Sequence, residues 1–279
     1  MRVEDCTVSV ERRSLQACVD LAIVFVRETA EPILRLWLLC AVPACVLVWL
    51  LTSVLTDMLI PSILIFLFFS AVFNSLLVAA IGPRVFGEEF SVRGALRAFR
   101  RRFWAWLLWT SIVRFFQFLS GFCLFFPGLF VTAYTAYLPE LLFLEQAPLK
   151  AVQPRLTWLA GSGGYGRSLN SLAWLMSAWA AASGGLFLLL DLTSSTVLNR
   201  PIFLQILMEG SVEFADLLLQ LTHDDPWFLT VLQLCLWMPL PVIRTAVFFC
   251  YLDRRIRAEC WDLQVLFRAE AVRVAELSG

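Results

Sequence analysis

Histidine and lysine are almost missing from the chain, which has one histidine, His223, and one lysine, Lys150. A Ser–His or Cys–His nucleophile pair would therefore have to use His223. This residue lies beside Asp224 and Asp225, but adjacent side chains diverge and no second His or Cys is nearby, which makes a poor metal site. We interpret the triplet as part of a solvated loop and expect no catalytic residues and no metal.

The eight cysteines contain no C-x-x-C spacing, so the sequence indicates neither a zinc site nor a disulfide framework. The Gly-rich stretch Gly161–Gly166 lacks the Lys–Ser/Thr pair of a P-loop and the Rossmann glycine spacing, and no strand precedes it. We interpret it as a turn in which the glycines allow the chain to reverse. The sequence therefore predicts no cofactor.

Charge is also scarce, because only 16% of the 279 residues are charged, whereas 60% are apolar and the mean hydropathy is +0.78. Soluble domains average about 45–50% apolar and about 25% charged residues. A single water-soluble core cannot hide this surplus, so lipid is the natural solvent. The net charge of zero gives no reason to expect a nucleic-acid partner. Acidic Glu4, Asp5 and Glu11 interrupt the start, which excludes a typical signal peptide.

The long apolar runs predict an all-α fold, a polytopic transmembrane helical bundle. A spanning helix needs about 20 mainly apolar residues. Such runs cover residues 33–55, 62–81, 103–121, 126–145, 169–190 and 228–251. We therefore predict about six spans, arranged as three hairpins. They form a transmembrane domain from 33 to 251, between an N-terminal segment (1–32) and a C-terminal tail (252–279).

The basic residues predict how these spans are oriented. Nineteen of the 22 precede or open the first span, or follow the second, fourth and sixth. The opposite side carries Arg200 together with seven carboxylates: Asp57, Asp191, Glu209, Glu213, Asp216, Asp224 and Asp225. Since cytoplasmic loops are enriched in Arg and Lys, we expect both termini in the cytoplasm of a bacterium and the spans in its cytoplasmic (inner) membrane.

Several segments outside the spans have amphipathic helical periodicity. Residues 10–28, 91–102 and 262–276 each place apolar side chains on one face and charges on the other. Such helices lie in the membrane interface with arginines near anionic lipid, or only cover the cytoplasmic ends of the bundle. The outer connection 192–226 keeps a helical period on both sides of Gly210. It predicts one or two amphipathic helices on the outer surface, with a re-entrant element as the alternative.

An internal repeat follows the second, fourth and sixth spans. Its copies are FGEEFSVR, FLEQAPLK and RAECWDLQ, which begin at residues 86, 143 and 257. In each copy a Glu is followed three residues later by Ser, Pro or Asp and then by Val or Leu. Ser and Asp are preferred helix N-caps, and Pro suits a first helical turn. The repeat predicts that each of these spans ends in a cytoplasmic turn that opens a new amphipathic helix.

Three segments carry a family resemblance: IGPRVFGEEFSVRGALRAFRRRFWAWL, FPGLFVTAYTAYLPELLFLEQAPLKAVQPRLTWL and FFCYLDRRIRAECWDLQVL. They resemble bacterial multi-spanning membrane proteins related to the membrane domain of glycerophosphodiester phosphodiesterases. The resemblance covers about residues 30–267. It implies a fold rather than an activity, since that membrane domain carries no known catalytic residues and no phosphodiesterase domain is expected here.

Three charged residues within the predicted spans form the candidate intramembrane polar site: Arg114, Glu140 and Arg244. A charge within the membrane is costly unless it is paired or hydrated. Glu140 and Arg244 lie at similar depths, about 7–10 Å from the inner ends of their spans, so we predict an ion pair. Neighbouring prolines at 139, 239 and 241 are expected to free backbone carbonyls as further partners. Arg114 is expected to reach a carbonyl, water or an anionic group.

These observations leave more than one function open. The first hypothesis is an integral membrane scaffold or accessory subunit without catalytic activity, which binds membrane lipids and a protein partner or a second copy of itself. The alternative is a lipid or small-solute binding or transport protein, in which Arg114 and Arg244 contact an anion. A membrane-embedded enzyme is a weaker alternative, because no acid–base cluster is present in the sequence.

Overall fold

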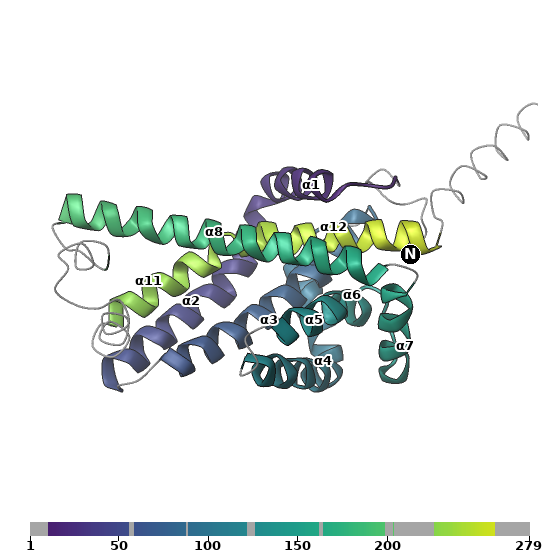
Figure 1. Ribbon diagram of the computed structural model, residues 1–279, viewed down its shortest axis with the longest axis horizontal. Helices are drawn as coiled ribbons and strands as arrows, with labels where there is room; N and C mark the ends of the chain where they lie inside the picture. Colours follow the sequence, from purple (N-terminus) through teal and green to yellow (C-terminus); the bar gives the residue numbers. More distant parts are fainter. Residues whose placement is uncertain are drawn as a thin grey trace, which may run out of the picture. The chain divides into compact units, whose positions relative to one another are not determined.

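The computed structural model describes residues 11–55, 59–87, 89–121, 126–161, 164–198, 203 and 226–259, which are almost entirely helical (Figure 1). The helices are α1 (Leu15–Glu28), α2 (Ala30–Val54), α3 (Leu59–Val85), α4 (Val92–Gly121), α5 (Phe126–Thr135), α6 (Leu138–Phe143), α7 (Leu149–Ala160), α8 (Gly164–Leu198), α11 (Pro226–Trp237) and α12 (Leu240–Glu259). The predicted all-α class is confirmed. The chain divides into two compact units: unit 1 holds residues 1–33, 74–175 and 242–279, and unit 2 holds residues 34–73 and 176–241.

Four helical stretches are long and apolar enough to cross a membrane: Ala30–Val54, Leu59–Val85, Gly164–Val197 and Trp227–Glu259. They contain the first, second, fifth and sixth predicted spans, and they suggest a membrane-embedded protein. The other two predicted spans do not form helices of this kind. Residues 103–121 are the C-terminal part of α4, and residues 126–145 are divided between α5 and α6.

The division of the fourth predicted span has a local cause. Residues 136 and 137 form a turn between α5 and α6, and Pro139 lies in the first turn of α6. Proline has no N–H to donate to the carbonyl of Thr135, so an unbroken helix would lose a hydrogen bond and gain a steric clash at this point. A new helix can begin there instead, because the missing donor costs little in a first turn.

Helices α4 to α7 pack together within unit 1, and α4, α5 and α6 lie side by side in Figure 1. The contact of α4 with α6 is aromatic, since Phe99 stacks on Phe143 with ring centroids 5.8 Å apart and also meets Trp106 at 4.9 Å. Arg102 of α4 donates to the carbonyls of Gln146 and Ala147, at 2.6 and 2.7 Å. The basic segment 91–102 is therefore fused to the third predicted span as one helix and holds the loop after α6.

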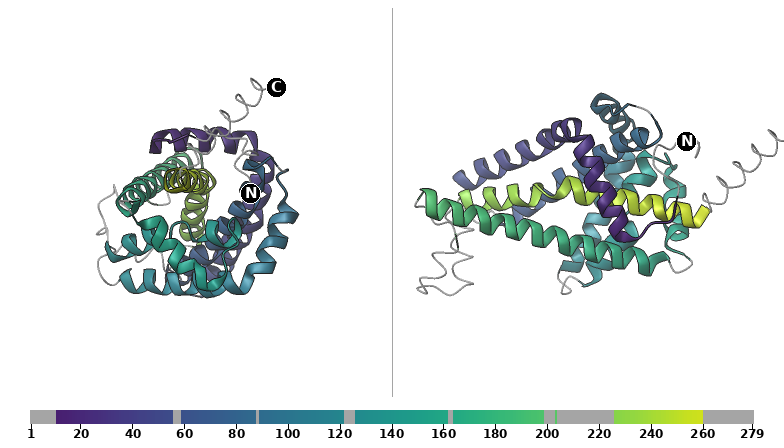
Figure 2. Two further views of the ribbon diagram at one scale, coloured as in Figure 1. Left: turned by 90° about the vertical axis from the view of Figure 1, so that its right-hand side faces the viewer. Right: turned by 90° about the horizontal axis from the view of Figure 1, so that it is seen from above.

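Helix α1 is the amphipathic N-terminal helix that the sequence predicts. Ser14 caps it by accepting a hydrogen bond from the N–H of Ala17 at 3.2 Å. Its buried face consists of Cys18, Ala22 and Phe25, and Phe25 meets Phe249 of α12 edge to face at 5.7 Å. Figure 2 shows α1 crossing α12 at a steep angle. The apolar face of α1 is therefore used for packing within the protein.

The repeat correctly places two of its three helix starts. Ser91 accepts a hydrogen bond from Gly94 N–H at 3.0 Å, directly before α4, and Pro148 precedes α7 with an extended backbone. The third start, at Asp262, lies outside the described residues, as do residues 1–10, the tail from 260 and the turn at 122–125. The predicted outer connection also lies mostly outside them, except that α8 continues to Leu198.

Unit 2 has its own apolar core, formed by residues of α2, α8 and α11: Val48, Phe187, Phe228, Leu229 and Cys235. Helix α11 ends at Trp237, and α12 begins at Leu240. Pro239 and Pro241 cause this break, because neither can donate to the carbonyl four residues earlier. The freed carbonyls must find donors elsewhere, since an unpaired polar group is expensive in an apolar surrounding.

Two tryptophan side chains donate to carbonyls at this break, and one of these, that of Trp237, lies four residues before Pro241. Trp179 Nε1 donates to the carbonyl of Leu236 at 3.0 Å, and Trp37 Nε1 donates to that of Trp237 at 2.8 Å. The indole rings are held by aromatic packing, with Phe66 stacked on Trp179 at 5.9 Å and edge to face with Trp237 at 5.6 Å. Pro241 thus frees the carbonyl of Trp237, as predicted, but its partner is an indole and not one of the charged side chains.

We expect Trp37→Phe and Trp179→Phe each to lower the free energy of unfolding by about 1–3 kcal/mol, because each leaves a part-buried carbonyl without its donor. Trp49→Phe is the matched control, since Trp49 is 39% exposed and its ring lies 6.5 Å from that of another indole in unit 2, Trp227. Unfolding in detergent micelles by SDS titration measures the difference. Equal stability of all three variants would contradict a capping role for these indoles.

Candidate functional site

Glu140 of α6 and Arg244 of α12 form the predicted ion pair. Arg244 Nη2 donates to Glu140 Oε1 at 2.5 Å, and the side chains of Arg244 and Glu140 are 7% and 0% exposed, respectively. Proline 139 and the new helix start place Glu140 on the first turn of α6, whose N-terminal end favours a carboxylate. Glu140 Oε2 and Arg244 Nε have no hydrogen-bond partner among the described residues. The pair is therefore neutral as a whole and sealed from water.

Arg114 belongs to a different group of contacts. Its Nη1 donates to Gln117 Oε1 at 2.9 Å, and Gln117 Nε2 donates to Thr132 Oγ1 at 2.8 Å. Thr132 in turn donates to the carbonyl of Gly128. This chain of hydrogen bonds joins α4 to α5. The structure thus brings together two of the three predicted site residues, and it places Arg114 in the α4–α5 hairpin.

A second set of charged residues, which we call the ion-pair ring, lies further along α12, on the helix face that carries Arg244. It consists of two glutamates and two arginines in alternation: Glu145, Arg155, Glu259 and Arg255. Arg155 Nε donates to Glu145 at 2.9 Å, and Arg155 also binds Glu259. Arg255 binds Glu259 at 2.8 Å and Glu145 at 3.5 Å. Each carboxylate therefore faces two guanidinium groups, and the four charges cancel.

Tyr251 joins the ion-pair ring to the core of unit 1. Its hydroxyl donates to Glu145 Oε1 at 2.5 Å, and its ring lies 5.7 Å from the ring of Tyr137. Partial burial lowers the pKa of Arg155, but the hydrogen bonds and charges of Glu145 and Glu259 outweigh it, so the pKa of Arg155 is raised. Arg155 therefore remains cationic at any physiological pH.

The spacing along α12 explains how one helix holds all of these groups. Arg244, Tyr251, Arg255 and Glu259 are separated by seven, four and four residues, which places them on a single face. That face meets α6 through Glu140, the following loop through Glu145, and α7 through Arg155. The arrangement is suited to locking α6 and α7 onto α12.

The ion-pair ring was not predicted, although the sequence contains a usable signal for it. Glu145 and Glu259 were identified only as repeat positions. Each is preceded by a Tyr–Leu pair at the same distance of eight residues, beginning at Tyr137 and Tyr251. The structure brings these two copies together through their tyrosine rings and their glutamates. The match between the segment from Tyr137 to Glu145 and the segment from Tyr251 to Glu259 therefore indicates two segments that pack against each other.

The opposite face of α12 fixes the segment before α1. Asp253 Oδ1 accepts the backbone N–H of Arg13 at 2.8 Å, and Arg257 donates to the carbonyl of Arg13 at 2.9 Å. Arg257 also pairs with Asp253 at 2.8 Å, so the two side chains form a clamp on one peptide. The carboxylate of Asp253 is fully engaged in this clamp.

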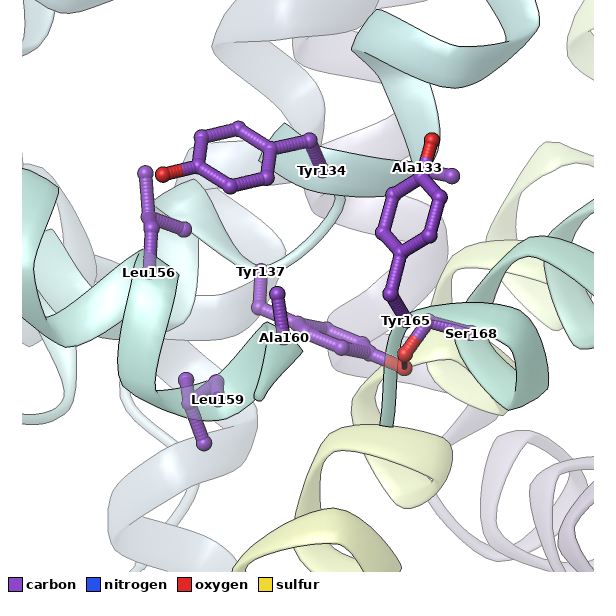
Figure 3. A pocket seen from close by; sticks show the side chains of 8 residues that line it. All are labelled: Ala133, Tyr134, Tyr137, Leu156, Leu159, Ala160, Tyr165 and Ser168. Carbon is purple, nitrogen blue, oxygen red and sulfur yellow. Dashed lines mark hydrogen bonds between the residues drawn. The ribbon is translucent and has the colours of Figure 1, made fainter. Parts of the chain in front are cut away.

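A small pocket in unit 1 is surrounded by three of the four tyrosines of the chain (Figure 3). Tyr134 bonds to Thr157 at 2.8 Å, Tyr165 donates to the carbonyl of Phe130 at 3.2 Å, and Tyr137 extends toward Ser168 at 3.4 Å. The pocket has room for about one water molecule. It is too small for an organic substrate.

No group of three or more His, Cys, Asp or Glu side chains placed to hold a metal occurs in the described ranges.

The four long apolar stretches suggest a membrane-embedded helical protein, and comparison with known proteins adds no closer relationship. No protein-family model, no curated protein and no solved structure matches the chain. The resemblance to the phosphodiesterase membrane domain therefore stays a prediction.

We expect Arg244→Ala to lower the free energy of unfolding by about 3–5 kcal/mol, because it leaves the buried Glu140 carboxylate without its cation. The double variant Glu140→Leu/Arg244→Met should recover most of that loss, since it removes both charges and retains their volume. SDS titration in detergent micelles measures both variants. Arg97→Ala, at an exposed position of α4, is the control. If the double variant is as unstable as Arg244→Ala, the ion pair does not account for the cost.

Proposed function

We propose that the chain is an integral protein of the bacterial cytoplasmic membrane that crosses the bilayer about six times, with both termini in the cytoplasm. Four crossings correspond to the long apolar stretches. The other two are the C-terminal part of α4 and the combined α5 and α6, which pack on each other as a hairpin. The distribution of arginines supports this orientation.

Exposed apolar side chains support a lipid-facing surface. Six large apolar side chains of α2 are between 44% and 53% exposed: Leu34, Leu38, Leu39, Val42, Val46 and Leu50. They recur at helical spacing over four turns, which forms a continuous apolar stripe. Contiguous patches of this kind are rare on soluble monomers and are typical of membrane or protein contacts.

We further propose that the protein is a scaffold or accessory subunit rather than a catalyst. The observation that carries this proposal is the mutual neutralisation of the charges that the fold brings together. Groups that neutralise one another hold helices in place, whereas catalysis needs an acid or base that a substrate can reach. The proposed relationship to the phosphodiesterase membrane domain is consistent with this function.

The alternative of an anion site at Arg114 and Arg244 receives less support. Glu140 already neutralises Arg244, and Arg114 lies in the polar contacts of the α4–α5 hairpin. By contrast, four exposed arginines of α4 form no ion pair within the described part of the chain: Arg93, Arg97, Arg100 and Arg101. With Trp104, which is 78% exposed, they offer a basic surface for a partner protein or for anionic lipid.

The six-span topology predicts that Leu119→Cys is labelled by a membrane-impermeant maleimide only from the outer side. Leu119 is 52% exposed near the end of α4, where that topology places the outer end of the third span. Gln153→Cys, at an exposed position of α7, is the control and should react only in inverted vesicles. The parent chain gives the background from its own cysteines. Labelling of both positions from the same side would contradict six crossings.

The scaffold proposal predicts that the chain, purified in mild detergent, carries one partner in a fixed ratio, either another protein or a second copy. Arg97→Glu/Arg100→Glu should remove it by reversing the charge of the α4 surface. Arg27→Glu/Arg84→Glu, which reverses two exposed arginines elsewhere, should retain it. Mass photometry and quantitative mass spectrometry give the ratios. A chain that is always a lone monomer would refute the proposal.

A further inference from the structure

Arg254 of α12 is a buried cation that pairs with no carboxylate in the described part of the chain. The residue is only 9% exposed, and its Nη2 donates to the carbonyl of Leu159 at 3.2 Å. Its Nε has no hydrogen-bond partner, and no ion pair of Arg254 occurs among the described residues. The adjacent carboxylate, Asp253, is engaged by Arg257 and by the backbone of Arg13. A buried charge of this kind is costly until an opposite charge joins it.

The guanidinium of Arg254 lies against the first residue of α8. A β-carbon on Gly164 would come within 1.7 Å of Arg254 Nη2 and 2.7 Å of the Leu159 carbonyl, so only glycine fits there. Helix α8 has 35 residues, and the N–H of Gly164 is already bonded to Gly161. The next two N–H groups, of residues 165 and 166, have no acceptor within the helix. The positive end of a long helix thus meets a buried guanidinium.

Two further features make this place suitable for an anion. Arg167, on the first turn of α8, adds a third source of positive potential that acts on Arg254. A β-carbon on Gly166 would meet no atom within 4 Å, so the first turn has open space at this position. Backbone N–H groups at a helix start combined with guanidinium groups are a recurrent arrangement for binding phosphate.

We propose that the start of α8, together with Arg254 and Arg167, binds a phosphate-class anion. The source is either the headgroup of an anionic phospholipid or a free phosphate, which share the chemistry that the site recognises. The sequence interpretation treated Gly161–Gly166 as a turn because no P-loop lysine follows it. Arg254, about 90 residues further along the chain, supplies the cation in its place. This site is independent of the scaffold function.

The charge of the site can be changed at Gly166 without disturbing the packing. Gly166→Asp places a carboxylate on the first turn of α8, where it should bind the local positive charge and exclude the anion. Gly166→Asn is its matched neutral control. In phosphate-free buffer the Asp variant should be at least as stable to heat as the Asn variant. A folding defect would lower stability and binding together, so the two effects are distinguishable.

The experiment measures binding to the purified full chain with two probes: phosphatidylglycerol, counted by native mass spectrometry after detergent exchange, and inorganic phosphate, measured by equilibrium dialysis. Gly166→Asp and Arg254→Gln should weaken binding by about tenfold or more. Gly166→Asn and Arg97→Gln should bind like the parent chain. Loss confined to phosphatidylglycerol identifies the lipid headgroup, and loss confined to inorganic phosphate identifies a free anion. The proposal is overturned if the parent binds neither probe, or if the Asp and Asn variants bind equally.

Discussion

A polar group that cannot reach water must find its partner inside the protein, and this requirement explains the main contacts of both units. In unit 2 it concerns backbone: two prolines interrupt the last long stretch, and two indoles take the carbonyls that are left. In unit 1 it concerns charge: Glu140 and Arg244 are neutral only as a pair, and the ion-pair ring repeats the solution with four residues. Apolar packing alone could assemble such helices, but it would leave these groups unsatisfied.

Helix α12 is the element on which unit 1 depends, because it serves several neighbours with different faces. One face carries the stripe from Arg244 to Glu259 and holds α6 and α7, while Asp253 and Arg257 clamp the peptide before α1. Arg254 faces the start of α8. A helix used in this way needs charges on several sides, which accounts for a dense polar end on an otherwise apolar stretch. It also implies that a single substitution in α12 affects more than one neighbour.

The sequence predicted the features that depend on the periodicity of apolar residues and on the free-energy cost of burying a charge. The length of the apolar runs predicted the four long stretches, and amphipathic spacing predicted α1. The similar depths of two charged residues predicted the pair of Glu140 and Arg244. It did not predict the turn before Pro139 or the partners of the ion-pair ring. Glu145 and Arg155 are close in the chain, but their meeting with Glu259 is decided by how α6 and α7 return to α12, over more than 100 residues. Spacing within one segment carries no such information.

The two Tyr–Leu segments explain why Arg254 in particular lacks a partner. When Tyr137 is aligned with Tyr251, and Glu145 with Glu259, the residue that corresponds to Glu140 is Arg254. The equivalent positions therefore carry opposite charges. Glu140 receives its counter-charge from within the chain, through Arg244, whereas Arg254 meets the positive end of α8. Burying Glu140 or Arg254 without a counter-charge would cost a similar free energy. Glu140 has its counter-charge in the described part of the chain, so Arg254 is the residue at which a charge from outside the described contacts completes the structure. Because the helix end adds to the positive potential there, that charge must be an anion.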